Sequence, residues 1–186
     1  GSELNETVTV EASTSGTVTL YSGTQAMGQG LVTSYLQIFS EKLELPPSRL
    51  RIVQGDTDLV EGHGSVGSRS LFVGGNALIG GTEEFLEKCL RLAASELEVS
   101  QEDLEYRQGS FQVRGTRVGI GLFDLCARQS SNSIVHKTSK ELTGRSWPNG
   151  CHVAEVEIDP ETGRVTLDRY TSIDDVGNAV NPMIVR

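Results

Sequence analysis

Hydrophobic and polar residues alternate along two segments of the chain, as they do in half-buried β-strands. In the first segment, Val8 and Val10 precede the sequence STSG, and Val18 and Leu20 follow it. A spacing of two brings alternate side chains to one face of a strand, and Gly16 suits a tight turn. The pattern therefore predicts a β-hairpin near the N-terminus.

The second alternating segment, HVAEVEIDPETGRVTLDRYTSIDD, begins at His152 and has the same organisation. Ala154, Val156 and Ile158 alternate with polar residues, and the stretch Asp159–Gly163 supplies a proline and a glycine for the turn. The following GRVTLDRYT resembles GTVTLYSGT of the first hairpin. We therefore predict a second hairpin, whose buried face carries this alternating set and the side chain of His152.

Each predicted hairpin is followed by a loop and the start of a helix. After the first hairpin, an apolar helical pattern covers residues 30–43 and stops at Pro46-Pro47. Its apolar face consists of Leu31, Tyr35, Ile38 and Phe39. After the second hairpin, Asn181 is suited to cap a helix and Pro182 to open one, and the sequence stops soon afterwards. We therefore expect the chain to be a fragment of a longer polypeptide.

The middle of the chain mixes strand and helix patterns. We expect a strand at RLRIVQ, a helix over residues 68–97, a hairpin over residues 101–115 that turns at Gln108-Gly109, and a short helix at GIGLFDLCARQ. Residues 130–150 are polar and aperiodic, which favours a long loop, either an insertion or a lid.

Glycines are unusually dense in the predicted long helix. Gly74, Gly75, Gly80 and Gly81 lie within it, and each weakens a helix by about 0.8 to 1 kcal/mol relative to alanine. Their density indicates a close approach by another backbone or by a ligand.

Together the patterns predict an α+β fold with mixed sheets and helices, in which two related β-hairpin-plus-helix units form two lobes and the second unit is truncated. Gly1 and Ser2 resemble a cloning scar. We expect residues 3–99 to form the first lobe with two glycine-rich loops. Residues 100–150 then supply a hairpin, a short helix and a long loop, and residues 151–186 the second hairpin and the start of the truncated helix.

Charge and composition argue against several classes of partner. The 186 residues carry a formal net charge of −9, which disfavours nucleic acid and an anionic membrane surface. No apolar run approaches the roughly 20 residues that cross a bilayer, and the N-terminus lacks the pattern of a secretion signal. Cys89, Cys126 and Cys151 are widely spaced without a C-x-x-C pair, so we expect reduced thiols, no metal-ligand cluster and a cytoplasmic location.

Two glycine-rich loops, Gly23–Gly30 and Gly55–Ser70, run directly into predicted helices. Backbone amides and a helix dipole converge on an anion in such places, which suits a phosphate. Arg69 is the one cationic side chain in either loop and can grip an anion with two parallel hydrogen bonds. Gln29 offers both a donor and an acceptor for a heterocycle or a metal-bound oxo group. Neither loop fits the Walker or the G-x-G-x-x-G pattern, so an anionic ligand and simple tight turns both remain open.

Five elements follow one another along the chain: SGTQAMGQG, GDTD, GSVGSRS, HVAEVEIDPETGRV and DDVGNAVNP. In order and spacing they resemble the molybdenum-binding subunit of the xanthine dehydrogenase and aldehyde oxidase family of molybdenum hydroxylases. The resemblance covers nearly the whole chain, corresponds to the C-terminal molybdenum-cofactor domain, and is greatest to bacterial members, including those similar to carbon monoxide dehydrogenase.

The resemblance implies a pyranopterin cofactor that holds molybdenum through its own dithiolene sulfurs, in a cytosine dinucleotide form or a shorter one. It implies that Gly28-Gln29-Gly30 lies against the pterin and the molybdenum ligands, with the Gln29 side chain bonding at the metal end. It also implies that Ser65–Ser70 wraps the pterin and phosphate portion. The cofactor-binding candidates are Gly28, Gln29, Gly30, Ser65, Gly67, Ser68, Arg69 and Ser70.

The family reaction, again by resemblance, is hydroxylation of a small-molecule aldehyde or N-heterocycle with oxygen from water. Electrons leave through iron–sulfur and FAD subunits or domains. The family's catalytic glutamate belongs to a G-x-G-E element that this sequence lacks, so no catalytic residue is assigned. Glu155 and Glu157 are expected on the solvent-facing side of their strand. We therefore expect the chain alone to be inert and to lack the cofactor.

Three functions remain compatible with the sequence. The first is the cofactor-holding part of a molybdenum hydroxylase subunit, which requires the two glycine-rich loops to converge on one side of the fold. The second is a free-standing phosphate- or nucleotide-binding module. The third is a non-catalytic scaffold homologue in which both loops are only turns.

Overall fold

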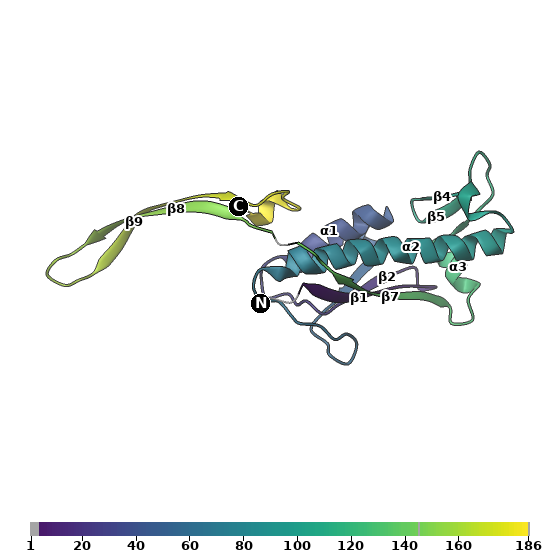
Figure 1. Cartoon of the computed structure of the whole chain (residues 1–186), viewed down its shortest axis with the longest axis horizontal. Helices are drawn as coiled ribbons and strands as arrows, with labels where there is room; N and C mark the ends of the chain where they lie inside the picture. The colour runs from purple at the N-terminus through teal and green to yellow at the C-terminus, as the bar shows by residue number, and fades with distance from the viewer. Residues whose placement is uncertain (1–3, 145, 186) are drawn as a thin grey trace. The chain divides into compact units, whose positions relative to one another are not determined.

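The structure is a computed structural model that describes residues 4–144 and 146–185. It divides between Thr143 and Gly144 into two units. The first unit contains two sheets with their covering helices, and the second contains a long hairpin and a short helix (Figure 1). The predicted α+β class with mixed sheets is confirmed.

A four-stranded mixed sheet forms the base of the first unit (Figure 1). Its strands run in the order β3-β2-β1-β7, which are Leu50–Val53, Val18–Ser22, Asn5–Ser13 and Ser133–Glu141. β1 pairs antiparallel with β2 and with β7, and β3 joins β2 in parallel. Buried and partly exposed residues alternate along β1 and β2, so one face of the predicted first hairpin builds the core.

Two helices lie across that face of the sheet (Figure 1). α1 (Leu31–Leu43) buries Tyr35 and Phe39, as the apolar pattern predicts, and ends just before the two prolines. α2 (Gly75–Leu97) follows a π-helical turn, η2 (Ser70–Gly74). The predicted long helix is therefore present, and its first turn is irregular.

The glycines at the start of the long helix make room for side chains of neighbouring elements. A Cβ on Gly74 would lie 2.0 Å from the hydroxyl oxygen of Tyr35. A Cβ on Gly81 would lie 2.6 Å from a methyl carbon of Val8. At Gly74 and Gly81 the close approach predicted from the glycine density is thus made by side chains and not by a second backbone.

A smaller sheet and a short helix complete the first unit. The sheet has the order β4-β5-β6, formed by Leu104–Arg107, Ser110–Val113 and Gly119–Gly121. The remaining elements are the 3-10 turns η1 (Pro47–Arg49) and η3 (Gln101–Asp103) and the helix α3 (Leu122–Ala127). The predicted turn at Gln108-Gly109 is confirmed, since both residues are left-handed, with φ of 46° and 79°.

The polar stretch 130–150, predicted as a loop, contains all of β7 and the first residues of β8. On the inward side of β7, Ile134 is apolar, whereas His136, Thr138 and Lys140 are polar and hydrogen-bond to Glu84 of α2. The sequence of the strand shows no hydrophobic alternation because its inward polar side chains form hydrogen bonds to the carboxylate of Glu84.

The second unit contains the predicted second hairpin, β8 (Asn149–Ile158) and β9 (Val165–Asp175), followed by α4 (Pro182–Val185). Asn181 caps α4, since its side-chain oxygen accepts from the Met183 amide at 3.0 Å. The predicted buried face is wrong for this unit, because both strands of the two-stranded ribbon are exposed along their whole length. Val156 is 50% and Ile158 is 59% exposed. Among the described residues, no helix is long and apolar enough to cross a membrane.

Candidate cofactor-binding site

The two glycine-rich loops lie against each other in the first unit. The Ser65 hydroxyl donates to the Gln25 carbonyl oxygen at 2.6 Å and accepts from the Gln25 amide at 3.0 Å. Gly23 and Gly62 are also in contact, because a Cβ on either would lie 2.4 Å from the Cα of the other. The loops therefore converge, as the family resemblance requires.

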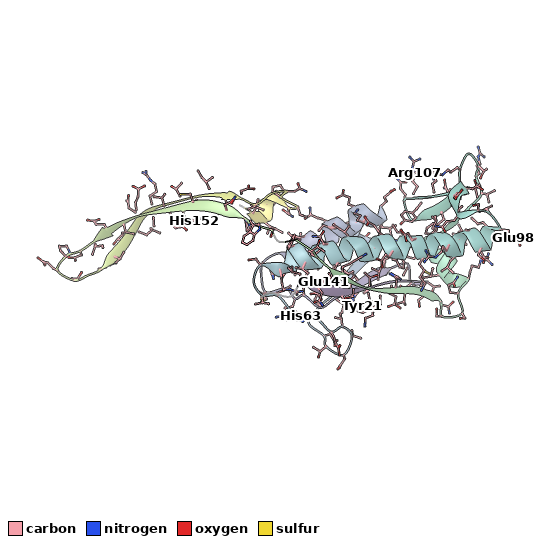
Figure 2. The ribbon with its side chains drawn as sticks, in the orientation of Figure 1. Tyr21, His63, Glu98, Arg107, Glu141 and His152 are labelled. Atoms are coloured by element: carbon pink, nitrogen blue, oxygen red, sulfur yellow. The ribbon has the colours of Figure 1, made fainter. Side chains whose placement is uncertain are left out.

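The convergence lies at one end of the long helix. His63, in the second loop, lies at that end, whereas Glu98 lies at the other (Figure 2). Because α1 also begins there, the two loops and the N-terminus of α1 form one continuous surface. This surface contains most of the residues that the sequence proposes for cofactor binding.

The first loop presents backbone groups next to the start of α1. Gly30 is left-handed, with φ of 75°, and precedes α1 without a side-chain cap or an acidic residue within the first turn. The first amides of a helix have no intrahelical partner, so those of α1 are available to an anion. Gly28 has a φ of 96°, and a Cβ placed on it would meet open space. The backbone here is open to a ligand.

The side chain of Gln29 forms hydrogen bonds to backbone groups of its own loop. Its side-chain oxygen accepts from the Met27 amide at 2.6 Å, and its side-chain nitrogen donates to the Gln25 carbonyl at 3.2 Å. Each end of a carboxamide can make a second hydrogen bond. Since Gln29 is exposed, its remaining donor and acceptor sites face the solvent.

The second loop contains an uncommon backbone conformation at the residues with the family pattern. Gly67 and Ser68 are both left-handed, with φ of 56° and 58°, and Arg69 then turns right-handed. A left-handed conformation is unfavourable for serine and tends to persist at functional sites. A change of hand between adjacent residues also turns successive amides to the same side, which favours an anion.

The Arg69 side chain points into the protein. Its guanidinium is 2% exposed and pairs with Glu6 at 2.7 Å, while it also donates to the carbonyls of Gly64 at 2.8 Å and Asn5 at 2.6 Å. The prediction that this guanidinium grips an anion directly therefore does not fit the structure. The sequence does not indicate this partner, Glu6 of β1, because Glu6 lies 63 residues from Arg69 and no local pattern connects the two.

Ser70 ends the second loop with its backbone carbonyl turned toward α1. That oxygen accepts from the hydroxyl of Tyr35 at 2.6 Å. Ser70 is one of the predicted cofactor-binding candidates, whereas the sequence predicts Tyr35 only as part of the apolar face of its helix. Of the eight candidates, seven are exposed or partly exposed in the two loops, Ser65 contacts the first loop through Gln25, and the side chain of Arg69 is turned inward.

Other polar clusters lie elsewhere in the chain. His152 bonds to Tyr170 at 2.6 Å and to Asp174 at 3.0 Å on the exposed hairpin, so its predicted place in a core is wrong. Asp174 also lines a hollow of about 520 Å³ within the second unit. Glu155 faces solvent as predicted and pairs with Arg169 at 3.6 Å. In the described part of the chain, no three His, Cys, Asp or Glu side chains are grouped as metal ligands.

Comparison with known proteins identifies the family. The family model for the molybdopterin cofactor-binding domain matches residues 1–186. The chain belongs to this family. Its curated relatives include enzymes named as xanthine dehydrogenase and carbon monoxide dehydrogenase subunits, which confirms the resemblance to the xanthine dehydrogenase and aldehyde oxidase family.

Two curated relatives illustrate how much of a protein this molybdopterin-binding domain represents. It is 33% identical to the 6-hydroxypseudooxynicotine dehydrogenase complex subunit gamma of Paenarthrobacter nicotinovorans, covering 100% of this chain and 25% of that one. It is 31% identical to the carbon monoxide dehydrogenase large chain of Afipia carboxidovorans, covering 91% and 22%. The chain thus spans about a quarter of the length of these relatives, which are named as subunits or chains of larger enzymes.

Two solved structures contain a region with the same fold as this chain. A Cu,Mo-CO dehydrogenase matches with a TM-score of 0.78 and 28% identity over 97% of this chain and 24% of that one. Quinoline 2-oxidoreductase from Pseudomonas putida 86 matches with a TM-score of 0.78 and 26% identity over the same shares.

The residues on the loop surface fit a molybdopterin. Such a cofactor carries phosphate on a bulky fused ring system, so it needs backbone donors and surface without side chains. The start of α1 offers amides without a side-chain cap, and Gly28 offers an open left-handed position. Gln29 adds one further donor and one acceptor.

Proposed function

We propose that this molybdopterin-binding domain cradles the pyranopterin of a molybdenum hydroxylase subunit between residues 28–30 and residues 65–70. The observation that carries the proposal is the convergence of the two loops, fastened by Ser65 and Gln25, beside the N-terminus of α1. Backbone amides would hold the phosphate and Gln29 would contact the metal end. Because the Arg69 side chain is buried against Glu6, we assign it a structural part in this cradle.

In a complete subunit the bound cofactor supplies the oxidation chemistry. We propose a small-molecule aldehyde or N-heterocycle as substrate, with iron–sulfur and FAD subunits or domains as electron acceptors. Relatives named quinoline 2-oxidoreductase and nicotine 6-hydroxylase support the N-heterocycle class. The domain's own residues bind and orient the cofactor, and we propose that the domain alone does not turn over such substrates, because its sequence has no G-x-G-E element.

Metal and nucleotide analysis of the complete subunit, purified from its native host, tests the proposal. We expect stoichiometric molybdenum by mass spectrometry. Cytidine monophosphate released by acid would identify the dinucleotide form of the cofactor, and molybdenum without a nucleotide would identify the shorter form. A subunit that is active in its host yet contains no molybdenum would contradict the proposal and favour a nucleotide-binding module or a scaffold.

A substitution at Gln29 tests the cradle itself. In the complete subunit we expect Gln29→Ala to lose molybdenum at least about tenfold faster than the wild type during dialysis, because a hydrogen bond to a charged group contributes about 1.5 to 3 kcal/mol. Gln112→Ala is a matched control, since Gln112 is exposed on β5 at the other end of the first unit (Figure 1). Equal molybdenum retention by the two variants would argue against contact between Gln29 and the cofactor.

A further inference from the structure

The hydroxyl of Tyr35 lies where the ends of the two glycine-rich loops meet. It donates to the carbonyl oxygen of Ser70 at 2.6 Å and lies 3.0 Å from the hydroxyl of Thr24. Tyr35 and Thr24 are both fully buried. Water therefore does not compete for these hydrogen bonds, and a lost partner is costly.

The direction of every hydrogen bond in this network follows from the number of protons. A hydroxyl carries one proton and two lone pairs. Since Tyr35 donates to Ser70, the Thr24 hydroxyl must donate to Tyr35. Thr24 then accepts twice, from the Ser22 hydroxyl at 2.8 Å and from the side-chain nitrogen of Gln54 at 3.1 Å. The hydroxyl of Thr24 is thereby saturated, and the network has one arrangement.

The members of this network are the ends of the two loops. Thr24 follows the first residue of the first loop, and α1, which carries Tyr35, follows its last. Gln54 directly precedes the second loop, and Ser70 is its last residue. The two buried hydroxyl groups of Tyr35 and Thr24 thus connect the beginning and the end of both loops.

Gly74 shows that the fold keeps space for this hydroxyl. A Cβ at that position would lie 2.0 Å from the Tyr35 oxygen, so only glycine admits the hydroxyl against the π-helical turn. Burial raises the pKa of Tyr35 to about 12. The hydroxyl therefore keeps its proton at neutral pH and always serves as the donor to Ser70.

We propose that Tyr35 is a positioning residue whose hydroxyl locks the two glycine-rich loops to each other and so fixes the shape of the cofactor cradle. Its effect on the cradle rests on the proposed function, whereas its effect on the loops does not. This role differs from that of an ordinary core residue. If the hydroxyl alone is removed, the proposal predicts faster local opening in the two loops and no change elsewhere in the fold.

Amide hydrogen exchange in the 186-residue chain tests the lock without any cofactor. Tyr35→Phe keeps the ring and removes the hydroxyl. We expect exchange in residues 23–30 and 55–70 to accelerate about five- to tenfold, the effect of one lost hydrogen bond on local opening. Thr24→Val, which keeps the size of the side chain and removes its proton, should accelerate the same amides.

Tyr106→Phe is the matched control. The Tyr106 hydroxyl donates to the Leu43 carbonyl at 2.6 Å, at the end of α1 away from the loops. The Tyr106→Phe variant therefore loses a hydrogen bond of the same length as Tyr35→Phe does, and we expect amides of the two loops to exchange at the wild-type rate in it. Loop exchange that is unchanged in Tyr35→Phe, or equally accelerated in Tyr106→Phe, would overturn the proposal.

Molybdenum content in the complete subunit tests the consequence for the cradle. We expect Tyr35→Phe to retain several-fold less molybdenum than Tyr106→Phe after the same dialysis. Equal retention would show that the lock does not position the cofactor and would overturn that part of the proposal. A wild-type subunit without molybdenum would instead contradict the proposed function, and the exchange experiment would still decide whether Tyr35 locks the loops.

Discussion

Among single residues, Gly74 and Gly75 form a natural pair of test positions. Both have right-handed helical conformations, with φ of −67° and −64°, so alanine is compatible with either backbone. A Cβ on Gly74 would meet the Tyr35 oxygen at 2.0 Å, whereas a Cβ on Gly75 would meet only ordinary contacts at 3.6 Å and beyond. The two positions therefore differ in the room available for a Cβ atom and not in their backbone conformation.

We expect Gly74→Ala to lower the free energy of unfolding by about 1 to 3 kcal/mol, because it overpacks a buried contact. Gly75→Ala should raise the free energy of unfolding by about 0.5 to 1 kcal/mol, because it removes a helix glycine. Urea denaturation followed by circular dichroism measures both. If both variants changed stability in the same direction, the contact with Tyr35 would not be the deciding factor.

The sequence predicted the loop residues better than their side-chain partners. Gly28, Gln29 and Ser65 belong to local patterns, and their exposure follows from the loops in which they lie. The loop sequence predicts an anion as the partner of Arg69, because it does not reveal the true counter-ion, Glu6, which belongs to a distant strand. For Tyr35 the sequence predicts only a core position. Helical periodicity indicates that the ring is buried, but it does not indicate which residue the hydroxyl contacts.

Among the elements, β7 and α2 are joined by one carboxylate. Glu84 accepts hydrogen bonds from Lys140, Thr138 and His136, which follow one another on the same side of β7. Gly80, one helical turn earlier, admits the Lys140 side chain, because a Cβ there would lie 2.5 Å from its Cε. The edge strand is thus held to the helix by polar contacts as well as by Ile134.

This contact should make stability depend on pH. Hydrogen bonds from Lys140, Thr138 and His136 lower the pKa of Glu84 from 4.5 to about 2. Because the folded-state pKa lies below the unfolded value, the carboxylate stabilises the fold fully above about pH 4.5 and progressively less as the pH falls toward about 2.

We expect Glu84→Gln to lower the free energy of unfolding at neutral pH by only about 1 kcal/mol, since Glu84 is 37% exposed and solvent screens its pairs. The difference from the wild type should shrink as the pH falls below about 4.5 and become small near pH 2. Urea midpoints measured across that range provide the test. A difference that stays constant with pH would show that the lowered pKa contributes nothing to stability.

The same strand explains where element prediction failed. The first hairpin, α1 and the turn at Gln108-Gly109 carry their own signals of alternation, helical period and turn glycine, and the structure has them all. β7 has no such signal, because its inward face is largely polar and is satisfied by a residue of α2. Only the tertiary contact makes that segment a strand.

For the whole molecule, the second hairpin is the feature that the isolated chain does not explain. Val156 pairs with Leu167 and Ile158 with Val165 in the ladder, and these side chains are 50% to 60% exposed. Two-stranded hairpins are marginally stable by themselves in water. An apolar face of this kind is typical of a surface that other protein covers, and the chain spans about a quarter of its relatives' length.

We therefore expect the apolar face of β8 and β9 to pack against the remainder of a complete subunit. Backbone amides of this hairpin should exchange much more slowly in the complete subunit than in the 186-residue chain, because packing suppresses the opening of a ribbon that is otherwise open to water on both faces. Amides of β1 serve as the control, since β1 already lies between β2 and β7 and should exchange equally in both proteins. Equally fast exchange of the hairpin in both would show that the remainder of the subunit leaves it uncovered, and the apolar face would then require a separate partner.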